Sequence, residues 1–237
     1  MRRGRGRAAA RRGPGIARTP PSAILAAGGR GERSGSSQPK QFRQLAGRSV
    51  LSRSLEIVLS SGCRPCVIAV PQDHLAEALA EVEGVSEAAV VPGGHTRQAS
   101  VRAALELVDS ELVVVHDAAR PFAPAALFGA VIEALTEADG AVPGAVADET
   151  LKRAKQGWIV ETVERAGLYR IQTPQAFRTA ALKDAHRRAQ RDGFEGTDDA
   201  QLLERLGYRI ALVEGTAPNP KLTHPADFEL AEALLRP

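Results

Sequence analysis

Short apolar runs alternate with longer segments of helical period from Ser22 onward, and this alternation limits the fold more than any other feature of the sequence. Five apolar runs predict β-strands at residues 23–27, 66–70, 88–91, 112–115 and 210–213. Four amphipathic segments between them predict helices at residues 50–59, 74–82, 96–108 and 124–138. Strands and helices that alternate in this way predict an α/β fold with a mostly parallel sheet flanked by helices.

Runs such as Val113-Val114-Val115 are apolar throughout, which is typical of strands covered by helices on both faces. In such sheets ligands bind at the carboxyl ends of the strands. The segments that follow three of the strands are dense in glycine or charge: 28–40, 92–97 and 116–121. We expect the chemistry of the protein there.

Residues 141–178 break the alternation. Two short β-like pieces, 141–146 and 158–163, enclose a polar centre, and we interpret this part of the chain as an excursion from the main sheet. The sequence contains no internal repeat and no second core, so it predicts a single domain over residues 22–237.

The basic residues are unevenly distributed along the 237-residue chain, whose net charge is +3. The first 21 residues hold seven of the 31 Lys and Arg and none of the 28 Asp and Glu, so the remainder carries 24 basic and 28 acidic residues. Residues 1–21 have little to bury, and we expect a disordered Arg-rich extension. A targeting presequence is the alternative interpretation of this segment.

No apolar stretch reaches the roughly 18 residues that a membrane-spanning helix needs, so we expect a protein without a membrane segment. Cys63 and Cys66 are spaced as C-x-x-C but lack the second pair or the histidines of a zinc site. Two thiols of this kind fit a reducing compartment, and we expect a cytoplasmic protein. The chain ends at Pro237, which predicts no fused downstream domain.

The first predicted strand leads into Ala27-Gly28-Gly29-Arg30-Gly31-Glu32-Arg33-Ser34-Gly35, which Pro39-Lys40 follows. Glycines let the backbone approach a phosphate closely, and Arg33 and Lys40 supply positive charge. The dinucleotide-binding fingerprint does not fit, because proline and charged residues stand where its helix would start, and the Walker lysine motif is absent. The loop therefore predicts a phosphate cradle of another kind.

This loop resembles the nucleotidyltransferase signature Leu-x-Ala-Gly-Gly-x-Gly-x-Arg. Six later segments extend the resemblance: 93–101, 116–121, 148–153, 173–175, 196–199 and 219–221. Together, over about residues 22–235, they resemble the 2-C-methyl-D-erythritol 4-phosphate cytidylyltransferases of the non-mevalonate isoprenoid pathway. Asp199 stands where that family often has Glu, and His95-Thr96 replaces a pair that is often acidic.

The resemblance implies a Rossmann-like nucleotidyltransferase fold with a protruding β-arm at about residues 141–170 that is used in dimerisation. It implies transfer of a cytidylyl group from CTP to the sugar-alcohol phosphate 2-C-methyl-D-erythritol 4-phosphate, with release of pyrophosphate. Mg²⁺ would be the cofactor, with Mn²⁺ as a substitute, and the active enzyme would be a homodimer.

The resemblance also implies roles for individual residues. Those implied to bind the nucleotide are Ala27, Gly28, Gly29, Gly31, Gly94, His95, Arg97, Ser100 and Asp117. Asp117 would also hold magnesium, directly or through the second coordination sphere. The cations implied in catalysis are Arg33, Lys40 and Lys221, because the reaction builds negative charge and needs no covalent nucleophile. Those implied to bind the acceptor are Arg120, Thr150, Arg165, Thr173 and Thr197.

Two other interpretations of the sequence remain open at this point. A ribitol 5-phosphate cytidylyltransferase would share the nucleotide half, although the segment from Thr150 to Arg153 is closer to the methylerythritol enzymes. A nucleotide-sensing or nucleic-acid-binding protein without turnover is the alternative of another class. A sensor is expected to lose one of the phosphate cations, and a nucleic-acid binder needs stacking aromatics, yet only 4% of the residues are aromatic.

Overall fold

The computed structural model describes residues 19–28, 39–216 and 219–235. Three predicted site residues, Gly29, Gly31 and Arg33, lie outside these ranges, as does most of the predicted extension. No helix in the described part of the chain is both long and apolar enough to cross a membrane.

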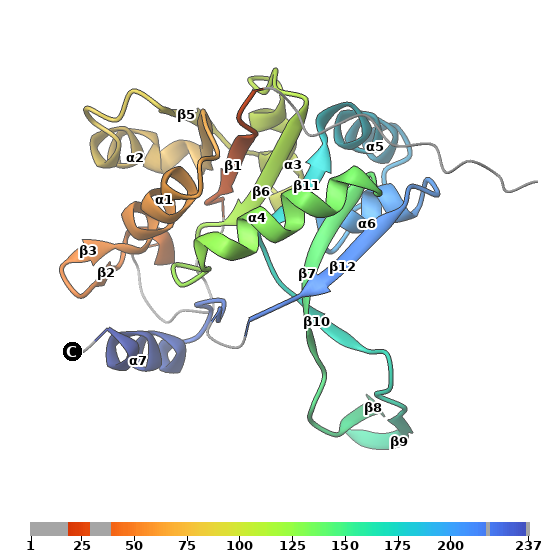
Figure 1. The fold of residues 1–237 in the computed structure, drawn as a ribbon. Coiled ribbons are helices and arrows are strands. Elements are labelled where there is room, and N and C mark those ends of the chain that lie inside the picture. Colours follow the sequence, from red (N-terminus) through yellow and green to blue (C-terminus); the bar gives the residue numbers. More distant parts are fainter. Residues whose placement is uncertain (1–18, 29–38, 217–218, 236–237) are drawn as a thin grey trace, which may run out of the picture.

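One sheet forms the centre of the molecule (Figure 1). Its strands are β1 (Ser22–Ala26), β4 (Cys66–Val70), β5 (Ala88–Pro92), β6 (Leu112–Asp117), β7 (Gly140–Val146), β10 (Tyr169–Ile171), β11 (Gln175–Arg178) and β12 (Ile210–Glu214). The order is β10-β7-β11-β6-β1-β4-β5, and β12 also pairs with β7, in parallel. The five predicted strands are all present. The sheet is parallel from β5 to β6, whereas β11 runs antiparallel to both β6 and β7.

The four predicted helices are also present, each within a few residues of its expected bounds: α1 (Val50–Ser60), α2 (Leu75–Glu81), α3 (Arg97–Leu105) and α4 (Ala125–Glu133). The structure adds three that the sequence pattern did not reveal: α5 (Thr179–Arg191), α6 (Asp199–Glu204) and α7 (Pro225–Leu234). Short elements complete the described chain: η2 (Lys40–Phe42), β2 (Gln44–Leu45), β3 (Arg48–Ser49), η3 (Gln72–His74) and η4 (Ala134–Thr136).

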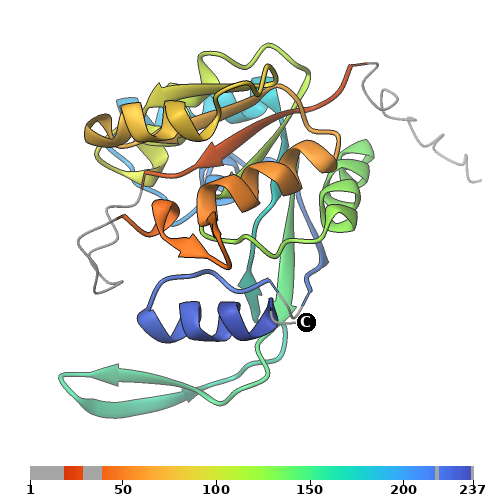
Figure 2. The ribbon, with the colours of Figure 1, turned by 90° about the vertical axis from the view of Figure 1, so that its left-hand side faces the viewer.

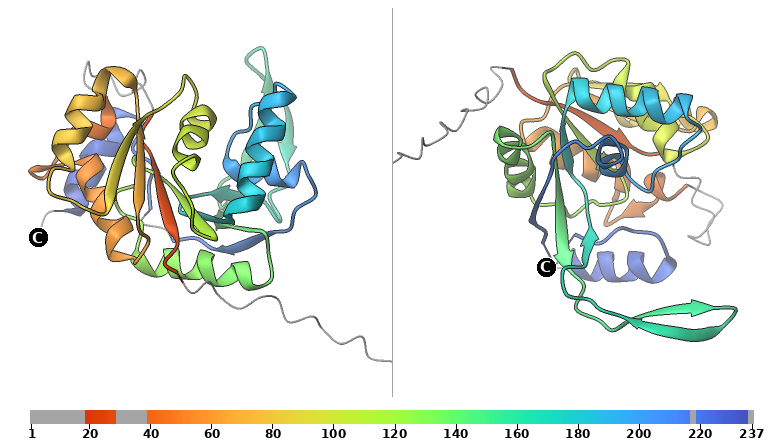
Figure 3. Two further views of the ribbon diagram at one scale, coloured as in Figure 1. Left: turned by 90° about the horizontal axis from the view of Figure 1, so that it is seen from above. Right: turned by 90° about the vertical axis from the view of Figure 1, so that its right-hand side faces the viewer.

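The two faces of the sheet bury separate hydrophobic clusters, because successive side chains of a strand point to opposite sides. In β1, Ala23 and Leu25 join the cluster that α1, α2 and α4 cover. Ile24 joins the cluster that α3, α5 and α6 cover. Figure 3 shows these two helix layers on either side of the sheet. The mostly parallel α/β sheet flanked by helices is therefore confirmed.

The predicted excursion is shorter than the sequence suggested. β7 and β11 pair within the main sheet, so residues 140–146 and 175–178 belong to the core of the fold. Only the segment between β7 and β10 leaves the sheet, and it forms the hairpin of β8 (Leu151–Lys155) and β9 (Trp158–Val163). The hairpin projects away from the body (Figures 1 and 2). The predicted excursion was too long because the polar residues that suggested it belong to the hairpin alone.

The C-terminal helix α7 covers a third, smaller cluster that includes Leu45, Leu222 and Phe228. The guanidinium carbon of Arg43 lies 3.6 Å from the centre of the Phe228 ring. The backbone of Leu222 donates a 2.8 Å hydrogen bond to the carbonyl of Ala119, just beyond β6. This packing brings the segment before α7 back to the carboxyl end of the central strands.

Two glycine-to-alanine substitutions should have opposite effects on stability. A Cβ atom at Gly140 would lie 2.7 Å from the buried ring of Phe177 and 2.8 Å from Ile210, so Gly140→Ala overpacks the core. We expect it to lower the free energy of unfolding by about 1–3 kcal/mol. At Gly129, inside α4, a Cβ atom meets nothing within 4 Å, and Gly129→Ala should raise stability by about 0.5–1 kcal/mol.

Urea unfolding of the two variants and the wild type provides the measurement. The described packing around β7 is wrong if Gly140→Ala is as stable as Gly129→Ala.

Candidate active site

The carboxylate of Asp117, at the end of β6, lies between two cations from distant parts of the chain. Its Oδ1 accepts a hydrogen bond from Arg97 Nε at 2.9 Å, and its Oδ2 accepts one from Lys221 Nζ at 2.6 Å. The Asp117 side chain is only 8% exposed. Burial alone would raise the pKa of this carboxyl, but the charges of Arg97 and Lys221 outweigh burial and hold the pKa well below its ordinary range. Asp117 is therefore an anion at neutral pH.

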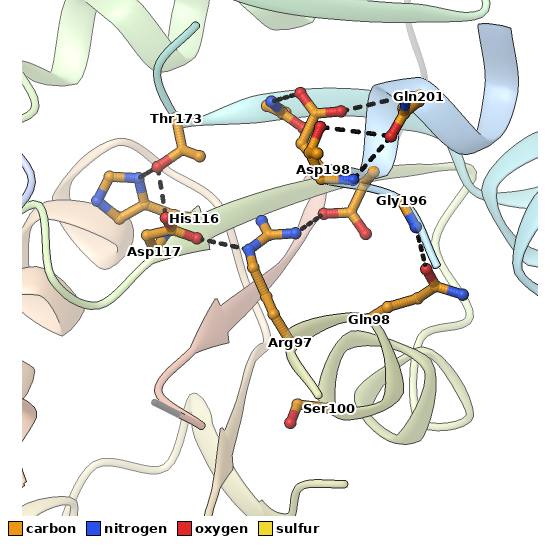
Figure 4. Close-up of polar contacts among 12 residues, drawn as sticks. Arg97, Gln98, Ser100, His116, Asp117, Thr173, Gly196, Asp198 and Gln201 are labelled. Carbon is orange, nitrogen blue, oxygen red and sulfur yellow. Dashed lines mark hydrogen bonds and ion pairs between the residues drawn. The ribbon is translucent and has the colours of Figure 1, made fainter. Parts of the chain in front are cut away.

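Arg97, in the first turn of α3, joins Asp117 to a second buried carboxylate (Figure 4). Its Nη1 donates to Asp199 Oδ2 at 2.7 Å, and Asp199 Oδ1 lies 3.1 Å from His186 Nε2. Burial would lower the pKa of Arg97, yet the two carboxylates outweigh it and raise that pKa. The Nη2 atom of Arg97 is buried and has no hydrogen-bond partner among the described residues. That nitrogen therefore keeps unused hydrogen-bond donors.

Three glycines of two loops pack closely against the N-terminal end of α3. Thr96 caps the helix by accepting from the backbone of Ala99 at 3.1 Å. The Ser100 hydroxyl lies under two loops, and a Cβ atom at either Gly28 or Gly93 would come within 2.6 Å of it. Gly94 donates its backbone N–H to the same hydroxyl at 3.2 Å. Any side chain at these loop positions would displace Ser100, which explains glycine after β1 and after β5.

A second network begins at the backbone of Asp117 and leads to Thr173. The Asp117 N–H donates to Thr173 Oγ1 at 3.0 Å, and this hydroxyl lies 3.0 Å from His116 Nδ1. His116 Nε2 lies 3.1 Å from the carbonyl of Arg120, which can only accept, so Nε2 carries the proton. Nδ1 of the neutral ring is then the acceptor for the Thr173 hydroxyl. The network fixes the Thr173 hydroxyl and the loop that carries Arg120.

These two networks border one cavity of about 200 Å³. Six of the predicted site residues line it: Arg97, Asp117, Arg120, Thr173, Thr197 and Lys221. The remaining lining residues are Ile171, Gln172, Gln175 and Asp198. Residues predicted for the nucleotide side and for the acceptor side therefore share one cavity.

The other predicted site residues lie elsewhere. Ala27 and Gly28 follow β1, and Gly94, His95 and Ser100 lie at or just before the start of α3. Lys40 begins η2, which the buried ring of Phe42 anchors. Thr150 and Arg165 flank the β8–β9 hairpin and do not line the cavity of their own chain. Arg165 Nη1 donates instead to the carbonyl of Asp148.

Three polar residues to which the sequence analysis gave no role in the site support it: His116, His186 and Asp199. All three are at most 1% exposed. His116 stands directly before Asp117, so its position beside a strand end was a usable signal. Nothing in the sequence marks Asp199 and His186 as partners of Arg97, because 102 residues separate Arg97 from Asp199.

The described residues contain no group of three His, Cys, Asp or Glu side chains arranged to hold a metal ion. Magnesium, however, is commonly held by one or two carboxylates together with substrate phosphates. Each Asp117 oxygen accepts one hydrogen bond in the described structure and retains a further lone pair. The donor set fits a metal ion that arrives with a phosphate ligand.

Protonation of His116 should make the protein less stable in mild acid. Burial lowers the pKa of this imidazole to about 4. An unfolded histidine titrates near about 6.5, so between these values the unfolded chain binds a proton that the folded chain does not. Stability should therefore fall by about 2–3 kcal/mol between pH 7 and pH 4.5 because of His116. Urea unfolding at both pH values measures the loss.

His116→Gln, which cannot titrate, should show a correspondingly smaller loss between the same pH values. Asp117 and Asp199, whose pKa values are lowered, contribute only at more acidic pH. An equal pH dependence in wild type and variant would contradict a neutral, buried His116.

Comparison with known proteins agrees with this architecture. The family described as IspD, 2-C-methyl-D-erythritol 4-phosphate cytidylyltransferase, matches residues 22–237. The 2-C-methyl-D-erythritol 4-phosphate cytidylyltransferase of Cereibacter sphaeroides is 41% identical over 220 residues, which are 90% of this chain and 96% of the relative. The bifunctional enzyme IspD/IspF of Rhizorhabdus wittichii is 43% identical over 89% of this chain and 55% of the relative. The chain thus spans about half the length of such bifunctional relatives.

Solved structures give the same result. The crystal structure of the cytidylyltransferase from Thermus thermophilus is 38% identical, covers 91% of this chain and 98% of its own, and superposes with a TM-score of 0.77. The synthase from Anaerococcus prevotii is 28% identical, covers 92% of this chain and 96% of its own, and gives a TM-score of 0.81. The chain belongs to the IspD family, the 2-C-methyl-D-erythritol 4-phosphate cytidylyltransferases.

Proposed function

We propose that this protein transfers a cytidylyl group from CTP to 2-C-methyl-D-erythritol 4-phosphate in isoprenoid precursor biosynthesis. The products are 4-diphosphocytidyl-2-C-methyl-D-erythritol and pyrophosphate. The observation that carries the proposal is the cavity in which Asp117 meets Arg97 and Lys221 on one side and Arg120 and Thr173 on the other. The match of the chain to the family over residues 22–237 supports the same reaction.

The reaction needs positive charge more than it needs a nucleophilic side chain. An oxygen of the acceptor phosphate forms a bond to the α-phosphorus of CTP, the bond to the bridging oxygen breaks, and pyrophosphate leaves with that electron pair. Negative charge grows on the oxygens of the α-phosphate and on the leaving group, so preorganised cations stabilise the transition state. In our proposal Arg33, Lys40 and Lys221 supply this charge. Lys221 lines the cavity, and its Nζ donates to Asp117 in the described structure.

On the acceptor side we assign the phosphate to Arg120 and the hydroxyls to Thr173 and Thr197. Arg120 Nη1 donates to the carbonyl of Asn219 at 2.7 Å, and Arg120 Nε is buried without a partner among the described residues. A guanidinium fixed in this way by the backbone presents its remaining donors to a phosphate with little loss of side-chain entropy.

We assign magnesium, with manganese as a substitute, to Asp117. When bound, the ion would neutralise phosphate charge beside the α-phosphorus. Asp117 would hold the ion directly or through water, and Arg97 would keep the carboxylate oriented. The two free thiols, Cys63 and Cys66, accord with the reducing cytoplasm in which we place the enzyme.

We further propose a homodimer in which the hairpin arm, residues 147–168, reaches the site of the partner subunit. The arm exposes apolar side chains that a monomer would leave in water: Trp158 is 78% exposed, Ile159 67% and Val160 56%. A groove of about 400 Å³ at the base of the arm is lined by residues that include Leu168, Tyr169 and Leu212. Thr150 and Arg165 lie on this arm and away from the cavity of their own chain, which supports their action across a dimer interface.

Pyrophosphate release, measured with each of the four nucleoside triphosphates against methylerythritol phosphate and ribitol phosphate in parallel, tests the reaction. We expect turnover with CTP and methylerythritol phosphate. A preference for ribitol phosphate would assign the chain to the sister reaction. Nucleotide binding without pyrophosphate release from any pair would indicate a sensing module.

Lys221→Ala should lower kcat more than it weakens substrate binding, because its charge matters most when the α-phosphorus is five-coordinate. Loss of one such group costs about 3–4 kcal/mol, or roughly 100–1,000-fold in rate. Lys40→Ala should behave alike. Initial rates over a range of CTP concentrations, with circular dichroism to verify the fold, provide the measurement. A folded variant with near-normal kcat would remove that lysine from the mechanism.

Mixing two impaired variants, assayed at a sugar phosphate concentration below the KM of Arg165→Ala, tests whether the arm crosses over. Arg165→Ala should raise the KM for the sugar phosphate and leave CTP binding almost unchanged. In a heterodimer of Arg165→Ala and Lys40→Ala subunits, one site would carry both defects and the other neither. Activity should recover to at most about half of wild type per heterodimer, as two-fold symmetry requires. If subunits exchange and the mixture is no more active than its parents, Arg165 does not act across the interface.

A further inference from the structure

A buried pair of side chains lies behind the candidate site, on the side opposite Asp117. His186 in α5 and Asp199 at the start of α6 are each 1% exposed, and His186 Nε2 lies 3.1 Å from Asp199 Oδ1. The second carboxylate oxygen, Oδ2, accepts from Arg97 Nη1 at 2.7 Å. A buried carboxylate is costly unless it is paired and hydrogen-bonded, so the position of Asp199 depends on both partners.

The protonation of His186 follows from its partner. A carboxylate oxygen can only accept a hydrogen bond, so Nε2 carries the proton that the Asp199 contact requires. His186 Nδ1 is buried and has no partner among the described residues. The ring therefore uses one nitrogen to fix the orientation of the Asp199 carboxylate, and it makes no other described hydrogen bond.

Asp199 in turn settles the orientation of the Arg97 guanidinium. The Asp117 carboxylate is shared with Lys221 and accepts from Arg97 through Nε. Asp199 holds Nη1, and two carboxylates from different elements together fix the plane of the guanidinium. This arrangement leaves Nη2 as the guanidinium nitrogen that has no partner in residues 19–28, 39–216 and 219–235. An unpartnered donor on a side chain that lines the cavity is suited to an oxygen of a ligand.

We infer that Asp199 is a positioning residue for CTP in the transfer reaction, that it acts by holding Arg97 Nη2 ready for the nucleotide, and that His186 fixes Asp199. The inference rests on the proposed function of this site. Because the donor is oriented before the ligand arrives, CTP binding does not have to order the Arg97 side chain. The acceptor sugar phosphate, assigned to Arg120 and the threonines, should not depend on Asp199.

Asp199→Asn keeps the shape of the side chain and removes its charge. We expect the KM for CTP to rise by about 10–100-fold, the range for a lost hydrogen bond to a charged group, while the KM for the sugar phosphate changes by less than about twofold. Asp199→Glu restores the carboxylate and should recover part of the affinity for CTP. In an Arg97→Ala background, Asp199→Asn should have little further effect on the KM for CTP, because both changes remove one interaction.

Gln98→Ala is the matched control for a general loosening of the contact between α3 and the segment before α6. Gln98, next to Arg97 in α3, donates from Nε2 to the carbonyl of Phe194 at 3.0 Å and accepts from the backbone of Gly196 at 2.9 Å. The variant cuts contacts between α3 and the segment before Asp199 without touching the ion pair. We expect a lower melting temperature with a nearly unchanged KM for CTP.

A second pair of variants keeps the test decisive should Asp199→Asn fail to fold. His186→Gln places an amide donor near the position of Nε2, and His186→Leu removes the donor. His186→Leu should raise the KM for CTP and His186→Gln should largely restore it. An unchanged KM for CTP in His186→Leu and in any folded Asp199→Asn, or an equal rise in Gln98→Ala, would overturn the inference. A wild type that does not turn over CTP would instead overturn the proposed function.

Discussion

The buried carboxylate of Asp117 is the group on which the rest of the site depends. Taking an anion out of water is expensive, and here Arg97 and Lys221 offset that cost by binding one oxygen each. Removal of either cation would leave a poorly compensated buried charge. Because Asp117 needs both cations, the N-terminal end of α3 and the segment before α7 both lie at the end of β6. The backbone hydrogen bond from Leu222 to Ala119 holds the second of these segments in place.

The topology of the sheet explains why these particular residues can meet. β5, β4, β1 and β6 are parallel, so the loops that follow them leave from one edge of the sheet. Gly28 follows β1, the glycines before α3 follow β5, and Asp117 ends β6. The antiparallel β11 adds Thr173 from its amino-terminal side, because the start of an antiparallel strand lies at the same edge as the ends of its parallel neighbours. One edge thus collects residues from most of the chain.

Periodicity predicted the central strands well, because runs such as Cys66–Val70 are apolar throughout and are too short to form a buried helix. It missed α5, although this helix separates a buried face from a strongly charged one, because the buried face consists of Ala, Thr and His with a single Leu and lacks a row of large apolar side chains. α6 is only six residues long and offers too few turns for a pattern. The family resemblance implied six residues of the cavity, but it offered Asp199 only as a position at which the acid varies. Its burial depends on helices that the pattern did not reveal.

The residues that we assign to the nucleotide and those that we assign to the acceptor are joined through two chemical groups of Asp117. Its carboxylate accepts from Arg97, and its backbone N–H donates to the Thr173 hydroxyl oxygen, whose own proton is donated to His116 Nδ1. His116 then holds the Arg120 carbonyl. All of these groups are hydrogen-bonded to His116 or Asp117 in β6. A shift of β6 would therefore move them together and keep their mutual geometry when the surrounding loops adjust to a ligand. The in-line transfer that we propose would depend on such a rigid element, because its two reactants must be held at a fixed separation.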